Sequence, residues 1–127
     1  MASKILIVDD EKEVAEVLYY LMQTNGFTPF KVHNGKDALE FIKHDKPDLV
    51  LLDVMMPEMD GFEVVKHLKS SPETSSIPVI MLTCLSDGQD FEKAIQLGAD
   101  WYTTKPFDFK KLLSNVKYLL ARSKEQA

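Results

Sequence analysis

The sequence has few of the features that mark secreted, membrane-embedded or nucleic-acid-binding proteins. Its 127 residues contain one cysteine, Cys84, so an internal disulfide cannot form, and a lone thiol is typical of a reducing, cytoplasmic setting. No hydrophobic run approaches the roughly 20 residues that cross a bilayer, and the first residues do not match a secretory signal. The net charge of −5 disfavours binding to nucleic acid or to anionic membranes, because both need clustered Lys and Arg.

The remaining composition is that of one ordinary globular domain. Hydrophobic residues make up 45% of the chain and charged residues 28%. A chain of this length can bury about two thirds of the surface that its unfolded form exposes, so its core needs no disulfide. We expect one domain over residues 1–127, with an ordered core over about residues 3–122 and a frayed end from Ser123 to Ala127.

Short apolar runs with strand character alternate with segments of helical period. The strand candidates are residues 4–8, 28–32, 48–52, 78–82 and 101–104, and a segment with apolar residues at helical spacing follows each of them. Because parallel strands need crossover connections, this alternation predicts an α/β fold with helices on both faces of a parallel sheet. The first, third and fourth runs are nearly all Val, Ile, Leu and Met, which places them at the sheet centre.

Four of these runs stop at a charged or hydroxyl residue. Asp9 and Asp10 follow the first run, Asp53 the third, Thr83 the fourth and Lys105 the last. The carboxyl ends of parallel strands share one edge of the sheet, and open α/β sheets bind ligands outside that edge. We therefore expect these five side chains to lie close together there.

Three carboxylates at one edge require a cation. Two unit charges about 5 Å apart repel by roughly 3 kcal/mol at an effective dielectric constant of 20. Mg²⁺ takes oxygen ligands and is commonly held by one or two carboxylates together with a substrate phosphate. A carboxylate beside such an ion can accept a phosphoryl group as an aspartyl phosphate. Lys105 and the Thr83 hydroxyl are suited to receive phosphoryl oxygens, one by charge and the other by a hydrogen bond.

Five short motifs then occur in a specific order and spacing. They are residues 7–11, residues 51–57 with Asp60-Gly61, Leu82-Thr83, residues 98–100 with Tyr102, and residues 105–107. Together they resemble the receiver domain of bacterial two-component response regulators, of the single-domain, CheY-like type, along nearly the whole chain. The resemblance implies a flavodoxin-like, doubly wound (βα)5 fold whose five-stranded parallel sheet has the strand order 2-1-3-4-5.

The resemblance implies a magnesium site and a phosphoacceptor. Asp53 would accept the phosphoryl group and also bind Mg²⁺, with Mn²⁺ as an alternative ion. Asp10 would be a direct metal ligand and Asp9 a ligand mainly through water. The backbone carbonyl of Met55 would complete the ligands that the protein provides.

The resemblance also implies how phosphorylation is sensed. Thr83 and Lys105 would contact the phosphoryl group. Tyr102 would rotate as Thr83 is drawn toward the phosphoryl group. The Lys105–Pro106 peptide bond would be cis, a geometry that is almost confined to proline.

The implied function is a phosphorylation-dependent signalling switch in the cytoplasm. A histidine kinase or phosphotransfer protein would donate the phosphoryl group, and an output protein would bind the face formed by the fourth helix, fifth strand and fifth helix. The chain would not be an enzyme beyond intrinsic self-phosphorylation from small donors and autodephosphorylation. A dimer that forms on phosphorylation is compatible with the resemblance, whereas direct contact with nucleic acid or membrane is not expected.

Two other classes compete with this interpretation. A pseudo-receiver keeps the fold as an interaction module without phosphorylation, but it usually lacks the acceptor, the acidic pair or the lysine, and this sequence has all three. A small Mg²⁺-dependent phosphohydrolase of the haloacid dehalogenase type usually has a second Asp two positions after its nucleophile, where this chain has Met55. Taken singly, Asp10 could cap the following helix and Lys105 could be a surface charge.

Two residues depart from the family pattern. Cys84 follows Thr83 where a small residue such as Ala is common, so its larger side chain would change access to the phosphoryl group. Trp101 stands where a small or acidic residue is common, and it either anchors a partner or packs against a helix end. The histidines show no metal-ligand spacing and are expected on the surface: His33, His44 and His67.

Overall fold

The computed structural model describes residues 2–83 and 88–126, so the expectation about Cys84 lies outside the described residues. The strands are β1 (Lys4–Val8), β2 (Thr28–Val32), β3 (Leu49–Asp53), β4 (Val79–Thr83) and β5 (Trp101–Thr104). The helices are α1 (Lys12–Thr24), α2 (Gly35–His44), α3 (Gly61–Lys69), α4 (Gly88–Gln96) and α5 (Phe109–Gln126). The predicted alternation of strands and helices is confirmed.

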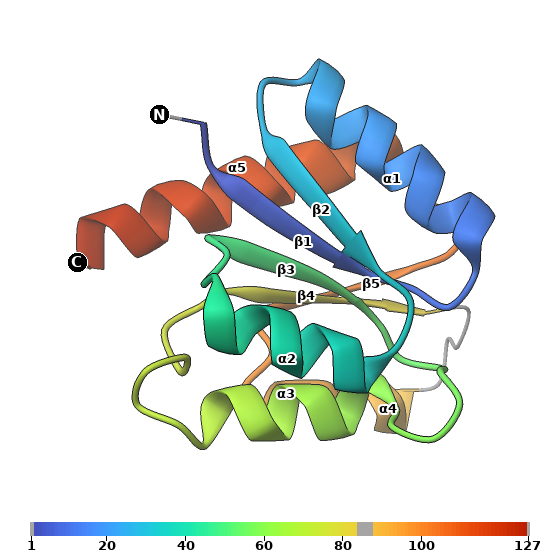
Figure 1. The fold of residues 1–127 in the computed structure, drawn as a ribbon, viewed down its shortest axis with the longest axis vertical. Coiled ribbons are helices and arrows are strands. Elements are labelled where there is room, and N and C mark those ends of the chain that lie inside the picture. The colour runs from blue at the N-terminus through green and yellow to red at the C-terminus, as the bar shows by residue number, and fades with distance from the viewer. Residues whose placement is uncertain (1, 84–87, 127) are drawn as a thin grey trace.

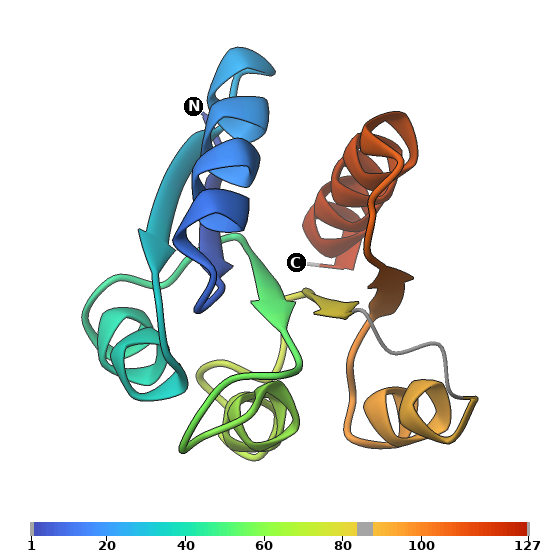
Figure 2. The same ribbon diagram turned by 90° about the vertical axis from the view of Figure 1, so that its right-hand side faces the viewer.

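The five strands form one parallel sheet in the order β2-β1-β3-β4-β5, which confirms the predicted fold and strand order. The three strands predicted at the centre, β1, β3 and β4, are the inner ones, and β3 and β4 are buried along their whole length. Two helices, α1 and α5, cover one face of the sheet, while α2, α3 and α4 cover the other (Figures 1 and 2).

Side chains that alternate along the central strands fill two separate cores. Leu6, Val8, Val50, Leu52 and Met81 belong to the core under α2, α3 and α4. Ile5, Ile7, Leu49, Leu51 and Ile80 belong to the core under α1 and α5. Because both faces of these strands are buried, only residues at the strand ends can combine a fixed position with access to solvent.

Short polar residues lie at several helix ends. The side chain of Asn34 accepts a hydrogen bond from the Asp37 N–H at 2.7 Å, and that of Asp60 accepts one from the Glu63 N–H at 2.9 Å. Asn25 ends α1, followed by Gly26 at a φ of 88°. Helix α5 continues to Gln126, past the predicted start of the frayed end at Ser123, and the fraying stays a prediction.

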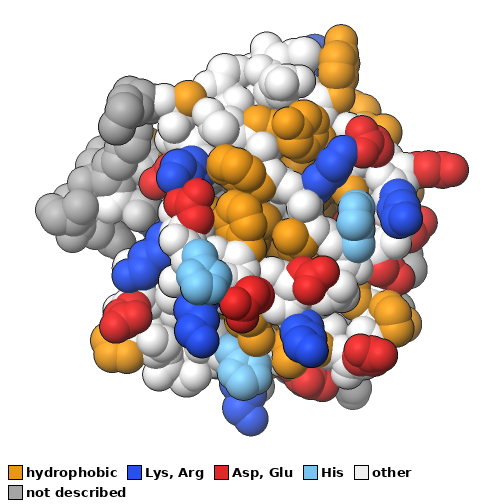
Figure 3. Space-filling model, in the orientation of Figure 1, with side chains coloured by type: hydrophobic (Ala, Val, Ile, Leu, Met, Phe, Trp, Pro, Cys, Tyr) orange, Lys and Arg blue, Asp and Glu red, His pale blue; other side chains and the backbone are white. Residues whose placement is uncertain are grey.

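The surface is mixed in charge. On the face shown in Figure 3, acidic and basic side chains are interspersed, and hydrophobic side chains reach the surface near its middle. Within residues 2–83 and 88–126, no helix is both long and apolar enough to cross a membrane.

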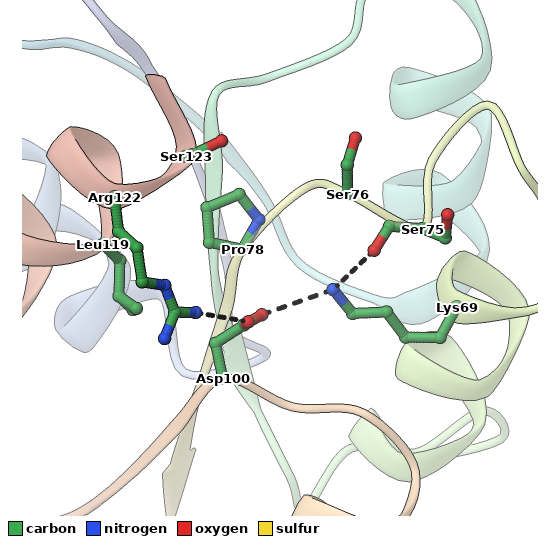
Figure 4. A pocket seen from close by; sticks show the side chains of 8 residues that line it. All are labelled: Lys69, Ser75, Ser76, Pro78, Asp100, Leu119, Arg122 and Ser123. Carbon is green, nitrogen blue, oxygen red and sulfur yellow. Dashed lines mark hydrogen bonds and ion pairs between the residues drawn. The ribbon is translucent and has the colours of Figure 1, made fainter. Parts of the chain in front are cut away.

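At the amino end of the sheet, Asp100 joins three elements through its carboxylate (Figure 4). One oxygen accepts the Val79 N–H at 2.9 Å and lies 3.3 Å from Lys69 Nζ, and the other lies 3.1 Å from Arg122 Nη2. Lys69 also donates to the carbonyls of Ser75 and Ile77, at 3.0 and 2.7 Å. These contacts line a cleft of about 380 Å³. Partners already occupy all three donors of the Lys69 ammonium. The residues of this cleft therefore hold the surrounding elements together and do not form an anion site.

Replacing Asp100 should therefore destabilise the fold without touching the opposite end of the sheet. In Asp100→Asn one acceptor becomes an NH₂ group that faces Lys69, Arg122 or the Val79 N–H. We expect the free energy of unfolding, measured by urea denaturation, to fall by about 1–3 kcal/mol. The control is Asp45→Asn, which breaks a contact with Lys4 between half-exposed side chains and should cost less than about 1 kcal/mol. Equal losses in the two variants would contradict the role of Asp100.

Candidate functional site

Three carboxylates meet at the carboxyl edge of the sheet. Oxygen atoms of Asp9, Asp10 and Asp53 all lie within 4.8 Å of one another. Asp9 and Asp53 are 0% and 2% exposed, whereas Asp10 is exposed. The sequence-based expectation that these acids converge is met, and two of them are withdrawn from the water that would normally solvate their charge.

The backbone around Asp9 orients its carboxylate. The Asp9 N–H donates to the carbonyl of Val32 at 3.2 Å, which extends the pairing of β1 with β2 beyond the strand end. One carboxylate oxygen then accepts the Glu11 N–H at 2.9 Å, a local turn that is typical of Asp. This hydrogen bond orients the Asp9 side chain toward the other two carboxylates. The acid that accepts a backbone N–H just before α1 is therefore Asp9 and not Asp10. Asp10 as the helix cap is therefore not what the structure shows, since the cap position is Glu11.

A close backbone approach supports Asp53 from behind. The Val54 N–H donates to the Leu82 carbonyl at 2.9 Å, and the Gly61 N–H donates to the Val54 carbonyl at 2.9 Å. A Cβ atom on Gly61 would lie 2.4 Å from the Asp53 carbonyl oxygen, so only glycine lets α3 begin this close to the end of β3. The end of β3 that carries Asp53 is thus held between β4 and the first turn of α3.

Lys105 brings the one positive charge that contacts this cluster within the described part of the chain. Its Nζ lies 3.1 Å from Asp9 Oδ2, 3.3 Å from Glu11 Oε1 and 3.6 Å from Asp53 Oδ1. The Lys105 N–H donates to the Thr83 carbonyl at 2.7 Å, which ties the end of β5 to the end of β4. Lys105 is therefore not a simple surface charge, because its side chain is 15% exposed and directed at carboxylates.

Burial and neighbouring charges shift both groups. Burial, together with the nearby negative charge of Asp9, raises the pKa of Asp53 to about 7, against the opposing effect of Lys105. Burial alone would lower the pKa of Lys105, but its contacts with Asp9, Asp53 and Glu11 outweigh that effect and raise it. The single ammonium does not compensate the acidic cluster, so Asp53 resists ionisation while no further cation is present.

The other predicted site residues lie around this cluster. Thr83 is fully buried at the end of β4, and Tyr102 is half-buried in β5, where its ring meets that of Phe91 edge to face at 5.6 Å between centroids. Met55 lies in the loop after β3. The Lys105–Pro106 bond is cis, in agreement with the resemblance. The metal contact of the Met55 carbonyl and the phosphoryl contacts of Thr83 and Lys105 stay predictions.

Two residues were misjudged or missed from the sequence. Glu11 had no assigned role, although its place directly after the acidic pair was a usable signal, because it shares their strand end. His33 was expected on the surface, but it is half-buried and its Nδ1 lies 3.1 Å from the Asp9 carbonyl. His33 follows β2, whose end lies beside that of β1, so the sheet order brings it to the site. His44 and His67 are exposed as expected.

The donor set fits a hard divalent cation. All three candidate ligands are carboxylate oxygens, which Mg²⁺ and Mn²⁺ prefer over nitrogen or sulfur. The raised pKa of Asp53 has the same implication, because it reflects a carboxylate that lacks positive charge nearby. Asp9, Asp10 and Asp53 are thus the residues that would hold the ion.

The pKa of Asp53 predicts that the metal-free protein loses stability as the pH rises. Its folded-state pKa of about 7 lies above the ordinary value of 3.8 for an aspartate, so the folded state binds more protons than the unfolded state between these values. Asn at position 53 removes this titration. In EDTA, the free energy of unfolding of Asp53→Asn minus that of wild type should increase by on the order of 2 kcal/mol from pH 5 to pH 7, and level off above the folded-state pKa.

Urea denaturation at each pH measures this difference. The same series on Asp45→Asn, at a half-exposed acid, controls for the removal of one carboxylate. A difference between Asp53→Asn and wild type that stays constant or shrinks as the pH rises would show that Asp53 is ordinarily ionised.

Comparisons with known proteins agree with this geometry. The sequence profile of the response regulator receiver domain matches residues 5–117. The chain is 42% identical to the signal receiver domain of a signal transduction histidine kinase from Syntrophus aciditrophicus, over 94% of this chain and 91% of that one, with a TM-score of 0.89. It is 31% identical to the Francisella response regulator 1452 receiver domain, over 95% and 98% of the two chains, with a TM-score of 0.89.

A third structure extends the likeness in fold alone. A CheY-like response regulator receiver domain protein from Methanospirillum hungatei JF-1 is 23% identical, with a TM-score of 0.94 over 100% of both chains. The profile match covers most of the sequence, and it includes all the acids and the lysine that meet at the sheet edge. The chain therefore belongs to the response regulator receiver domain family.

Proposed function

We propose that this chain is a phosphorylation-dependent switch in which Asp53 accepts a phosphoryl group from a histidine kinase or phosphotransfer protein. The observation that carries the proposal is the cluster of Asp9, Asp10 and Asp53 within 4.8 Å, with Lys105 Nζ 3.6 Å from Asp53. Receiver domains in general are regulatory phosphoacceptors, so the proposal concerns which residues of this chain do the work and in what order.

The transfer itself is a substitution at phosphorus. A carboxylate oxygen of Asp53 attacks the phosphorus atom of a phosphohistidine, the P–N bond breaks, and the imidazole leaves with the bonding electron pair and takes up a proton. Asp53 must be ionised to attack, and a bound Mg²⁺ would supply the positive charge that favours its ionised form and neutralises phosphoryl oxygens. Asp9 and Asp10, with the Met55 carbonyl, would hold that ion.

After transfer, the phosphoryl group carries more negative charge than the carboxylate it replaces. Lys105 would pair with one phosphoryl oxygen, and the Thr83 hydroxyl would donate to another. Thr83 lies at the end of β4, and the neighbouring strand β5 carries Tyr102. A movement of Thr83 would therefore take place close to the half-buried ring of Tyr102. The ring would then change the surface formed by α4, β5 and α5, to which an output protein or a second phosphorylated copy would bind. The small-donor reactions and autodephosphorylation belong to the same proposal, as does a cytoplasmic location.

An acyl phosphate tests the phosphoacceptor directly. With acetyl phosphate and Mg²⁺, intact-mass spectrometry should detect one added phosphoryl group on wild type and none on Asp53→Asn. EDTA should abolish the adduct, and Asp10→Asn should need more Mg²⁺ to form it, by about tenfold or more if the ligand is direct. In metal-free solution Asp10→Asn should also be more stable than wild type, because one repulsive charge is gone.

The alternatives give different results. Absence of any adduct on wild type would favour a pseudo-receiver, and it would overturn the proposal if Mg²⁺ binding is intact. Steady turnover of acetyl phosphate without a persistent adduct would favour a hydrolase. Loss of stability in metal-free Asp10→Asn would contradict mutual repulsion within the cluster.

The place of Trp101 on the proposed output face can be tested separately. Its side chain is 48% exposed on the edge strand β5, beside a groove that Lys110 and Lys111 also line. If Trp101 serves as an anchor for partners, Trp101→Ala should reduce the free energy of unfolding by less than about 1 kcal/mol. Packing against a helix end would instead cost about 3 kcal/mol or more. Urea denaturation decides, with the buried Leu112→Ala as a control that should lose about 2–5 kcal/mol.

A further inference from the structure

Before any phosphoryl group arrives, the Lys105 ammonium already donates to Asp9 and Glu11 and lies 3.6 Å from Asp53 Oδ1. An ammonium has three N–H donors, and three carboxylates surround this one, from Asp9, Glu11 and Asp53. A phosphoryl oxygen that pairs with Lys105 therefore competes with the carboxylates that already contact it. The identity of the displaced carboxylate determines what else changes at the site.

Burial identifies Glu11 as the partner that leaves. The Asp9 side chain is 0% exposed and accepts the Glu11 N–H, so it cannot turn to water without breaking the turn that orients it. Asp53 is the residue that becomes modified. The Glu11 side chain is 63% exposed and lies at the mouth of the site, so its carboxylate can be rehydrated at little cost.

The Glu11 side chain has no competing duty in the helix. Glu11 is the N-cap residue of α1, but among the described residues its side chain makes no capping hydrogen bond. Its contact with Lys105 at 3.3 Å is the interaction recorded for its carboxylate. Glu13, which is also exposed and acidic, lies two positions further on in the first turn of α1 and forms no ion pair with Lys105 within the described part of the chain.

We propose that Glu11 competes with the phosphoryl group for Lys105. While the ion pair between Glu11 and Lys105 is intact, it slows phosphorylation of Asp53 and destabilises the phosphorylated form. This inference rests on the proposed function of Asp53. Glu11 acts through Lys105 and is a positioning residue, not a catalytic one. Its negative charge at the mouth adds repulsion of anionic donors to this competition.

The test compares Glu11→Gln with the matched charge change Glu13→Gln. With Mg²⁺ and acetyl phosphate at low ionic strength, the rate of adduct formation on Asp53 should rise about two- to fivefold in Glu11→Gln, the range expected for an ion pair with one exposed partner. Glu13→Gln should stay within about 1.5-fold of wild type, as expected for an exposed charge with no ion-pair partner among the described residues. The gain should shrink at about 1 M salt, where the Debye length is about 3 Å.

A second variant separates the pairing from the charge. Glu11→Asp keeps the negative charge but shortens the side chain by one methylene, so it loses reach to Lys105. It should behave like Glu11→Gln if competition for Lys105 sets the rate, and like wild type if repulsion alone does, which would overturn the pairing. Aspartate is also a better N-cap than glutamate, so the variant should not lose stability.

An equilibrium measurement avoids dependence on turnover. Fluoroberyllate with Mg²⁺ coordinates a carboxylate and mimics a phosphoryl group, and its apparent dissociation constant can be followed by amide NMR signals of residues 101–105. Glu11→Gln should bind it tighter by the same two- to fivefold factor. Unchanged rate and affinity in Glu11→Gln would overturn the inference while leaving the switch intact. No adduct on wild-type Asp53 would overturn the proposed function itself.

Discussion

The repulsion among Asp9, Asp10 and Asp53 is the constraint on which the rest of the site depends. The sheet register sets it, because Val8 pairs with Leu52 and Asp53 pairs with Leu82, so the ends of the central strands are level. Two of the three carboxylates are buried, and the one ammonium that contacts them among the described residues also contacts Glu11. The fold therefore holds negative charge where water cannot fully solvate it, and the free energy that this requires comes from the two apolar cores. This edge of the sheet therefore disfavours the binding of anions and favours the binding of a divalent cation.

The two ends of the sheet illustrate opposite uses of a carboxylate. At the amino end, Asp100 lies among Lys69, Arg122 and the Val79 N–H, so its charge is matched and its position is fixed. At the carboxyl end, three acids share Lys105, and the pKa of Asp53 rises to about 7 as a result of burial and of the charge of Asp9. A network in which every charge is paired stabilises the fold and binds further ions only weakly. A network with unpaired negative charge is stabilised when it binds a cation or when its own charge changes. Function is thus located where the electrostatic balance is incomplete.

The elements and the core of the site were predictable because they depend on local patterns. Apolar runs that stop at Asp9, Asp53, Thr83 and Lys105 identified the sheet edge, and the parallel arrangement followed from the alternation of runs and helices. The order of the strands came from the family resemblance, since alternation alone does not select it. Contacts between distant residues were not predictable: Asp100 reaches Lys69 and Arg122, 31 and 22 positions away. The same applies to Glu11 and Lys105, which are 94 positions apart. His33 was misplaced because a lone histidine after a strand gives no sign of which neighbouring strand end it meets.

When a lysine already contacts several carboxylates, a phosphoryl group does not simply attract it. The phosphoryl oxygen has to compete with a carboxylate that the lysine contacts. The gain from pairing Lys105 with a phosphoryl oxygen is the difference between that pair and the contacts it replaces. An exposed acid such as Glu11 reduces this difference only modestly, because most of the energy of a half-solvated ion pair is returned by water when it breaks. A buried acid in its place would reduce it much more, since the carboxylate left behind would be neither paired nor hydrated. In the proposed exchange, the exposure of Glu11 would make its ion pair with Lys105 easy to break, which is a property that a two-state switch requires.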